Sequence, residues 1–146
     1  MRTHAFRLHR GDDLRQSIAQ YARDHGLQAA VILSCVGCLS KARLRDATGV
    51  RVRDISTHAE IVSATGTISQ EGLHIHISIS LDDLSTLGGH LAEGCIVNTT
   101  VEVVLLEMDD VAFTRAFDAQ TGYDELVVLP RAYTSAPLSR NYHALC

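Results

Sequence analysis

The residues best suited to chemistry are two histidines in an alternating segment. In LHIHISISL, residues 73–81, His74 and His76 alternate with isoleucines and with Leu73. Because successive side chains of a β-strand point to opposite faces, both histidines lie on one face, about 6.5 to 7 Å apart along the backbone. Two imidazoles at that spacing can converge on one ion, since Zn–N bonds are about 2 Å long. The segment predicts a strand that carries a metal-chelating pair.

A third histidine follows in the glycine-rich loop expected over 82–94, as Gly88-Gly89-His90. Paired glycines let a backbone turn sharply or pass close to another strand, which would bring the third imidazole within reach. Three histidine ligands leave coordination positions for water, a substrate or an anion, and imidazole suits zinc, copper, iron or nickel. The competing interpretation is that His74 and His76 lie on a solvated face and that His90 is an ordinary loop residue.

The elements around these histidines predict one β-rich domain, since 146 residues suit a single core. A helix is expected to begin at the N-cap Asp12 and to end at Gly26, with Leu14 and Ile18 on its apolar stripe. The apolar run over 27–39 predicts a central strand covered on both faces. Further strands are expected over 4–9, 41–45, 50–55, 60–69, 73–81, 95–108, 113–118 and 125–129. The domain is expected over 1–130, followed by a C-terminal arm or tail over 131–146.

Composition and charge narrow the function classes. The chain is 46% hydrophobic and 21% charged, as expected for a globular protein, and its net charge of −4 disfavours a domain held to DNA by its surface field. The first dozen residues alternate instead of forming a signal peptide, and no apolar run is long enough to cross a bilayer. We therefore expect a cytoplasmic protein without a membrane partner, and reduced cysteines.

A second candidate site is a row of basic residues. Lys41, Arg43 and Arg45 occupy alternate positions of one strand. Such a row could hold phosphate, a nucleic acid or a carboxylate. The competing interpretation is a solvated strand edge that its charge protects from aggregation.

Glu102 and a cysteine pair complete the candidates. Glu102 lies between Val101 and Val103 of a core strand, where we expect it to be buried and to need a partner. It is a candidate catalytic base or a support for a ligand histidine; the alternative is a buried structural hydrogen bond near Thr99 and Thr100 or to another subunit. Cys35 and Cys38 have C-x-x-C spacing, but a strand places positions three apart on opposite faces. We interpret them as small buried residues and not as a redox pair.

Three ordered motifs carry a family resemblance: G-x-H-x-H-x-S at 72–78, GGHL at 88–91 and G-x-x-V-x-T-T-x-E at 94–102. Over about residues 4–129 the chain resembles the PPC (plant and prokaryote conserved) domain. The resemblance implies an α/β (α+β) fold with a mainly antiparallel sheet flanked by helix, assembled as a homotrimer. It also implies a divalent metal at His74, His76 and His90, with zinc the expected ion.

In plants the PPC domain follows an AT-hook, a short basic arm that enters the DNA minor groove, and this sequence has no Arg-Gly-Arg-Pro arm. The first hypothesis is a trimeric, metal-binding PPC protein, with a regulatory or DNA-binding role and a DNA or protein partner implied by the resemblance alone. The alternative is a metal-dependent enzyme that acts on a small polar substrate, with Glu102 as the base.

Overall fold

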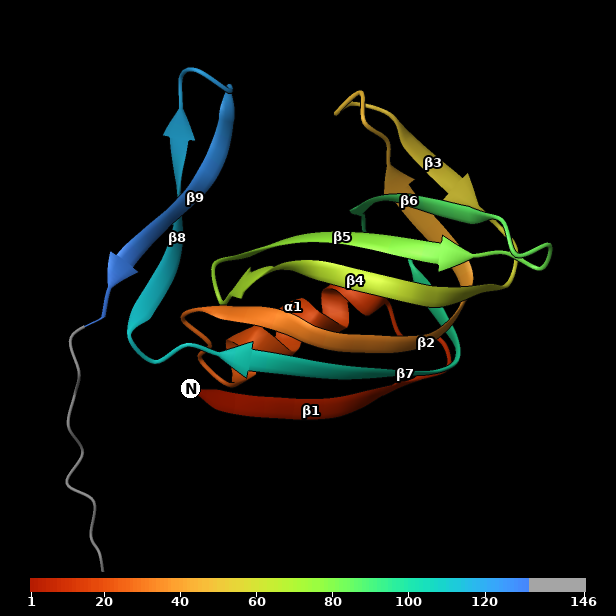
Figure 1. The fold of residues 1–146 in the computed structure, drawn as a ribbon, viewed down its shortest axis with the longest axis horizontal. Helices are drawn as coiled ribbons and strands as arrows, with labels where there is room; N and C mark the ends of the chain where they lie inside the picture. The colour runs from red at the N-terminus through yellow and green to blue at the C-terminus, as the bar shows by residue number, and fades with distance from the viewer. Residues whose placement is uncertain (132–146) are drawn as a thin grey trace, which may run out of the picture.

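The computed structural model describes residues 1–131 and shows a curled antiparallel sheet, one helix and a projecting hairpin (Figure 1). The elements are β1 (Arg2–His9), α1 (Leu14–Asp24), β2 (Ala30–Arg45), β3 (Val52–Ile55), β4 (Ala59–Ser69), β5 (Gly72–Ser80), β6 (Thr86–Leu91), β7 (Ile96–Glu107), β8 (Val111–Asp118) and β9 (Tyr123–Pro130). The tail expected over 131–146 lies outside the described residues, apart from Arg131.

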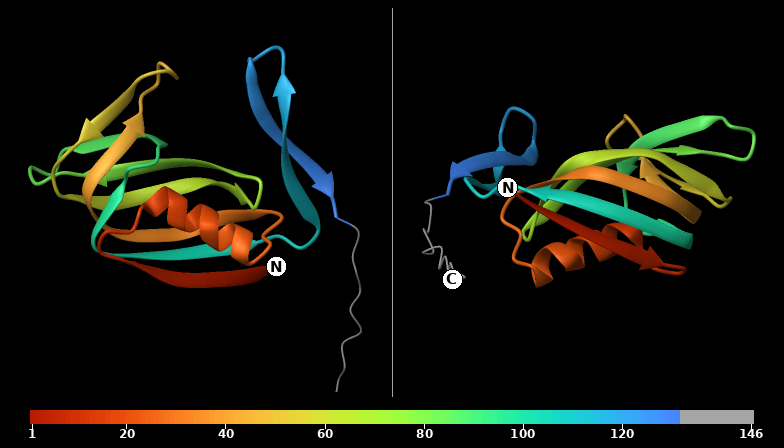
Figure 2. Two further views of the ribbon diagram at one scale, coloured as in Figure 1. Left: turned by 180° about the vertical axis from the view of Figure 1, so that it is seen from behind. Right: turned by 60° about the horizontal axis from the view of Figure 1, so that its bottom comes forward.

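The main sheet has the order β1-β7-β2-β4-β5-β6, with β3 paired to β2. It also closes on itself, because the C-terminal end of β2 pairs with β6 through Leu44↔Leu91 and Arg45↔His90. All the strand pairs of the described residues are antiparallel, which confirms the expected mainly antiparallel sheet. The α/β label is loose, since a single short helix covers one face (Figure 2).

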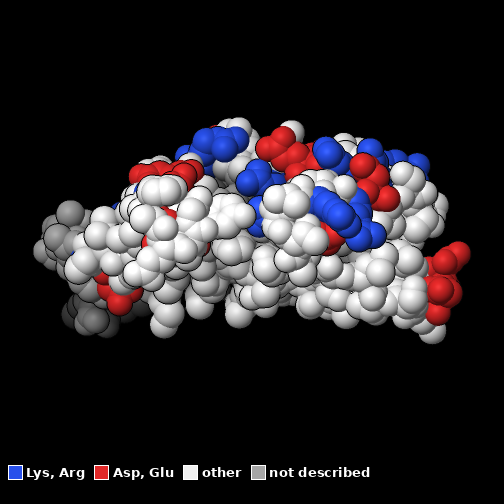
Figure 3. Space-filling model, turned by 90° about the horizontal axis from the view of Figure 1, so that it is seen from above, with Lys and Arg blue, Asp and Glu red and all other residues white. Residues whose placement is uncertain are grey.

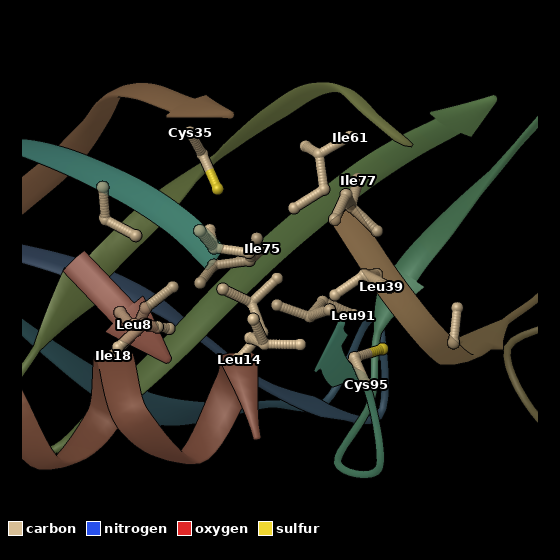
Figure 4. Close-up of a cluster of buried hydrophobic side chains, with 14 of the residues drawn as sticks. Leu8, Leu14, Ile18, Cys35, Leu39, Ile61, Ile75, Ile77, Leu91 and Cys95 are labelled. Carbon is tan, nitrogen blue, oxygen red and sulfur yellow. The ribbon is translucent and has the colours of Figure 1, made fainter. Parts of the chain in front are cut away.

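The core lies between that helix and the inner face of the sheet. Leu14, Ile18 and Ala22 of α1 are fully buried, and they belong to the same cluster as Ile75 and Ile77 of β5 (Figure 4). Burial of each large aliphatic side chain contributes about 1.5 to 3 kcal/mol. The alternation in β5 therefore fixes which face holds the isoleucines and which face is left to the histidines. Within residues 1–131, no helix is long and apolar enough to cross a membrane.

Three local expectations are corrected by the structure. The N-cap is Asp13, whose carboxylate accepts from Gln16 N at 3.0 Å, whereas the Asp12 carboxylate accepts from His9 N in the preceding turn. The two separate strands expected over 27–39 and 41–45 are one continuous strand, β2, which begins at Ala30. Among residues 1–131, nothing covers its outer face at Leu33, which is 60% exposed.

The hairpin β8–β9 forms a separate two-stranded sheet at the end of the main one (Figures 1 and 2). Its first strand is attached by a backbone hydrogen bond from Phe113 N to Gln28 O of 2.9 Å. Two side-chain bonds add to this attachment: Thr114 Oγ1 donates to Glu71, and Arg115 donates to Thr67 Oγ1 at 3.3 Å. These contacts hold Arg115 next to Thr67 of β4, which is the register partner of His74 on β5.

Candidate metal centre

The three predicted histidines meet on the outer face of the sheet. His76 of β5 pairs in register with His90 of β6, and His74 lies two residues along the same face. One ring nitrogen from each histidine lies within 4.8 Å of the others. The ring centroids are 5.1, 5.2 and 5.6 Å apart. Gly88 and Gly89, which we expected in a loop, belong to strand β6.

This donor set fits a divalent ion. A tetrahedral ion with N ligands at about 2.0 Å holds its donors roughly 3.3 Å apart. His74 Nε2 and His76 Nε2 are 3.3 Å apart, and a ring nitrogen of His90 lies within 4.8 Å of both histidines' donor atoms. The Nδ1 atom of His90 is buried and has no hydrogen-bond partner among the described residues. An unpaired buried nitrogen is destabilising, and a bound ion or a water that it holds would satisfy it.

Gly89 allows the third histidine to reach the site. A Cβ atom at this position would lie 2.7 Å from Arg45 O and 3.2 Å from Leu44 Cβ, so no larger residue fits without a shift of the β2 backbone. A Cβ at Gly88 would come no closer than 3.3 Å to Ile77 O. The glycine at 89 therefore permits the close pairing of β6 with β2 that places His90 beside His74 and His76.

Lowered pKa values favour the neutral, metal-binding form of two of the imidazoles, His74 and His90. Burial lowers the pKa of His90 to about 4, and the positive charge of Arg45 adds to this effect. Burial also lowers the pKa of His74, with further contributions from His76, Arg115 and Arg45, while Glu125 opposes the shift. Because a metal ion competes with protons for these nitrogens, the lowered pKa values favour metal binding at neutral pH.

A pocket of about 410 Å³ opens beside His74 and His90. Three guanidinium groups line it, from Arg15 of α1, Arg45 of β2 and Arg115 of β8, and the hairpin adds the carboxylate of Glu125 and its neighbour Asp124. Arg15 pairs with Glu93 at 3.2 Å, whereas Arg45 and Arg115 form no ion pair within residues 1–131. The pocket therefore combines the imidazoles of His74 and His90 with two arginines that no carboxylate of the described residues contacts.

The predicted basic row separates into two parts. Lys41 and Arg43 both contact Asp54, at 3.3 and 3.2 Å, so their charge is largely compensated. Arg45 points to the histidine pocket. From above, Lys and Arg are interspersed with Asp and Glu and do not form a continuous basic surface (Figure 3).

Glu102 and the cysteines lie away from this pocket. The expected burial of Glu102 is wrong: alternation points Val101 and Val103 into the core, so Glu102 is exposed. β7 is separated from β5 by β2 and β4, and hence by roughly 14 Å at about 4.8 Å per strand. Thr99 contacts Cys38 Sγ. Cys35 is buried, which raises the pKa of its thiol to about 11 and disfavours a thiolate.

Sequence reasoning missed Arg15, Arg115 and Glu125. They lie on α1, β8 and β9, and only the tertiary structure brings them to the histidines. No local spacing relates these positions to His74, so the sequence alone offered no signal for them.

A profile of the Plants and Prokaryotes Conserved (PCC) domain matches residues 1–109. The chain therefore belongs to this family, the one that its motifs resemble. It is also 37% identical over 137 residues to the bifunctional protein GlmU of Synechococcus sp. strain JA-3-3Ab, a match that covers 94% of this chain and 22% of that protein. The chain thus spans about a fifth of the length of the curated relatives that it matches.

Solved structures agree with this assignment. A hypothetical protein from Salmonella enterica has a TM-score of 0.86 and 34% identity, over 89% of this chain and 94% of that one. A metal-containing protein from Archaeoglobus fulgidus has a TM-score of 0.75 and 28% identity, over 87% and 94%. A candidate DNA-binding protein from Bacteroides thetaiotaomicron has a TM-score of 0.77 over 86% and 91%, and its 21% identity shows a shared fold alone.

Replacement of Gly89 by alanine should disrupt the site. The added Cβ would press on the carbonyl of Arg45, so we expect a loss of about 1 to 3 kcal/mol of unfolding free energy. Metal content after purification should fall as His90 is displaced. Chemical denaturation and elemental analysis measure the two effects. The matched control is Gly88→Ala, which should change both much less; equal effects of the two substitutions would contradict the argument.

The metal-free protein should lose stability as the pH falls. His90 has a lowered pKa of about 4 when folded, against an ordinary value of 6.5, so between these values the unfolded chain binds more protons. Above pH 6.5, His90 should not change the unfolding free energy with pH. Below pH 6.5, the unfolding free energy should decrease as the pH falls toward 4. Denaturation at several pH values tests this, and His90→Gln should flatten the profile. An NMR titration midpoint of His90 at or above 6.5 would refute the prediction.

Proposed function

We propose that this chain is a metal-binding PPC domain that holds one divalent ion through His74, His76 and His90. The observation that carries the proposal is the convergence of three ring nitrogens within 4.8 Å. The buried, unpaired Nδ1 of His90 and the lowered pKa values of His74 and His90 support it. Zinc is the ion we propose, since three neutral imidazoles are a common zinc ligand set. The metal-containing Archaeoglobus relative is consistent with this assignment.

The bound ion would keep positions open toward the pocket. Three protein ligands leave a tetrahedral ion one position for water or a small molecule, and the ion supplies a Lewis-acid centre there. The 410 Å³ pocket lies in the size range of small-molecule sites. This observation favours a second candidate function, a metal-dependent enzyme for a small polar substrate. The catalytic base of such an enzyme would be Glu125, which lies in the pocket, and not Glu102.

We further propose that the domain works as a homotrimer, as the family resemblance implies. The single chain leaves Leu33, Val36 and Val62 exposed at 60%, 51% and 58% on the central strands β2 and β4. Apolar side chains on a sheet face are typical of surfaces that another chain covers. A trimer would bury this apolar face between subunits. Protein partners would then bind to the trimer and not to the single chain.

A DNA-associated role has weaker physical support than metal binding. The net charge is −4, and Asp54 compensates Lys41 and Arg43 of the predicted basic row. Binding to duplex DNA draws most of its affinity from neutralised phosphates, which requires a concentrated positive surface. Arg45 is directed to the histidine pocket, where a small anion is a better match than a duplex.

Elemental analysis of the purified, tag-free protein tests the metal site. We expect close to one divalent ion per chain in the parent and a loss of nearly all of it in the His74→Ala/His76→Ala variant. The matched control is His9→Ala/His58→Ala, which removes two exposed histidines away from the site. Light scattering on the same samples should give three times the chain mass. A folded parent without metal would contradict the site, and a monomeric mass would contradict the assembly alone.

A further inference from the structure

Two arginines that line the pocket beside the histidines, Arg45 and Arg115, have no carboxylate in contact within residues 1–131. Arg45 pairs in register with His90, and Arg115 donates to Thr67, the register partner of His74. Both arginines are partly buried, and neither forms an ion pair within residues 1–131. Guanidinium groups in such settings commonly bind carboxylates or phosphates, often through two parallel hydrogen bonds.

A divalent ion at the three imidazoles would add two positive charges beside these arginines. Two positive charges repel each other more strongly in a partly buried site than in water. The carboxylates of Asp124 and Glu125 also line the pocket, but they belong to the hairpin, and neither pairs with Arg45 or Arg115. With the ion bound, the pocket would carry two more positive charges than its carboxylates offset, which leaves a place for an external anion on the arginine side.

We propose that Arg45 and Arg115 bind the anionic oxygen group, a carboxylate or a phosphate, of a small molecule, and that this anion and the metal ion bind cooperatively. The inference rests on the proposed metal site, because the cooperativity requires the ion. The carboxylates at the hairpin end of the pocket would accept hydrogen bonds from a hydroxyl or an ammonium group at the other end of the same molecule. The ligand class is thus a small organic acid or phosphate ester that also carries a hydrogen-bond donor.

The proposal predicts an unusual sign for arginine substitutions. Without an anion, Arg45→Gln and Arg115→Gln remove repulsion, so each should increase the affinity for the metal. With an anion, the same variants should lose the enhancement that the parent shows. A merely structural role of either arginine predicts the opposite, a weaker metal site under both conditions. Reciprocity requires that the metal raise the anion affinity by the same factor.

The test uses Co²⁺ as the probe metal, followed by its absorption spectrum against a competing chelator. Sulfate stands for a phosphate group and acetate for a carboxylate, and sodium perchlorate keeps the ionic strength equal in every sample. In the parent we expect one of the two anions to raise the Co²⁺ affinity by about fivefold or more, within the usual range of coupling between sites. The anion with the larger effect identifies the group that the arginines prefer.

Lys41→Gln is the matched control, because Lys41 lies on the same face of β2 but contacts Asp54 and lies outside the pocket. It should retain the parent's anion effect. An affinity that neither anion changes in the parent would overturn the inference while leaving the metal site intact. Weaker Co²⁺ binding by both arginine variants without an anion would overturn it as well.

Failure of the metal site itself is distinguishable. If the parent binds no Co²⁺, the proposed function fails, and the arginines are examined in the metal-free protein by the NMR signals of their Nε–H groups. Shifts of the Arg45 and Arg115 signals on addition of sulfate or acetate would support the anion site by itself. The absence of any such shift would overturn that part too.

Discussion

The close pairing of β6 with β2 is the constraint on which the site depends. It closes the curled sheet, and it requires a glycine at 89, where any side chain would press on the backbone of Arg45. Without the close pairing of β6 with β2, His90 would not lie beside His74 and His76. The same contact sets Arg45 directly opposite His90, so a single packing requirement positions both a nitrogen donor and a positive charge.

Charge and burial act together at this site. The partial burial of His90 lowers its pKa, and Arg45 lowers it further, so the imidazole stays neutral where solvent alone would leave it partly protonated. A neutral imidazole can accept an ion, but the arginines that help to keep it neutral also repel that ion. For the ion that we propose, this arrangement predicts an occupancy that depends on the surrounding anions, unlike that of a structural metal site, whose ligand set is normally closed.

Much of the fold and the histidine cluster could be predicted from the sequence, because both arise from local patterns. The alternation of residues 73–81 places Ile75 inside and His76 outside, and the Gly-Gly pair indicates a close approach. Glu102 was misplaced because its apolar neighbours concealed the simple alternation of a strand with one exposed face. Arg115 and Glu125 could not be found, since their approach to His74 depends on how a distant hairpin docks at the end of the sheet.

The hairpin β8–β9 lies beyond residues 1–109, the stretch that matches the family profile, yet it lines the pocket with Arg115 and Glu125. The three histidines all lie inside that stretch. The proposed ion ligands and Arg45 therefore belong to one segment of the chain, and Arg115 with the pocket carboxylates belongs to the next. Remodelling this one hairpin would therefore change which molecules the pocket accepts and leave the three proposed ion ligands in place.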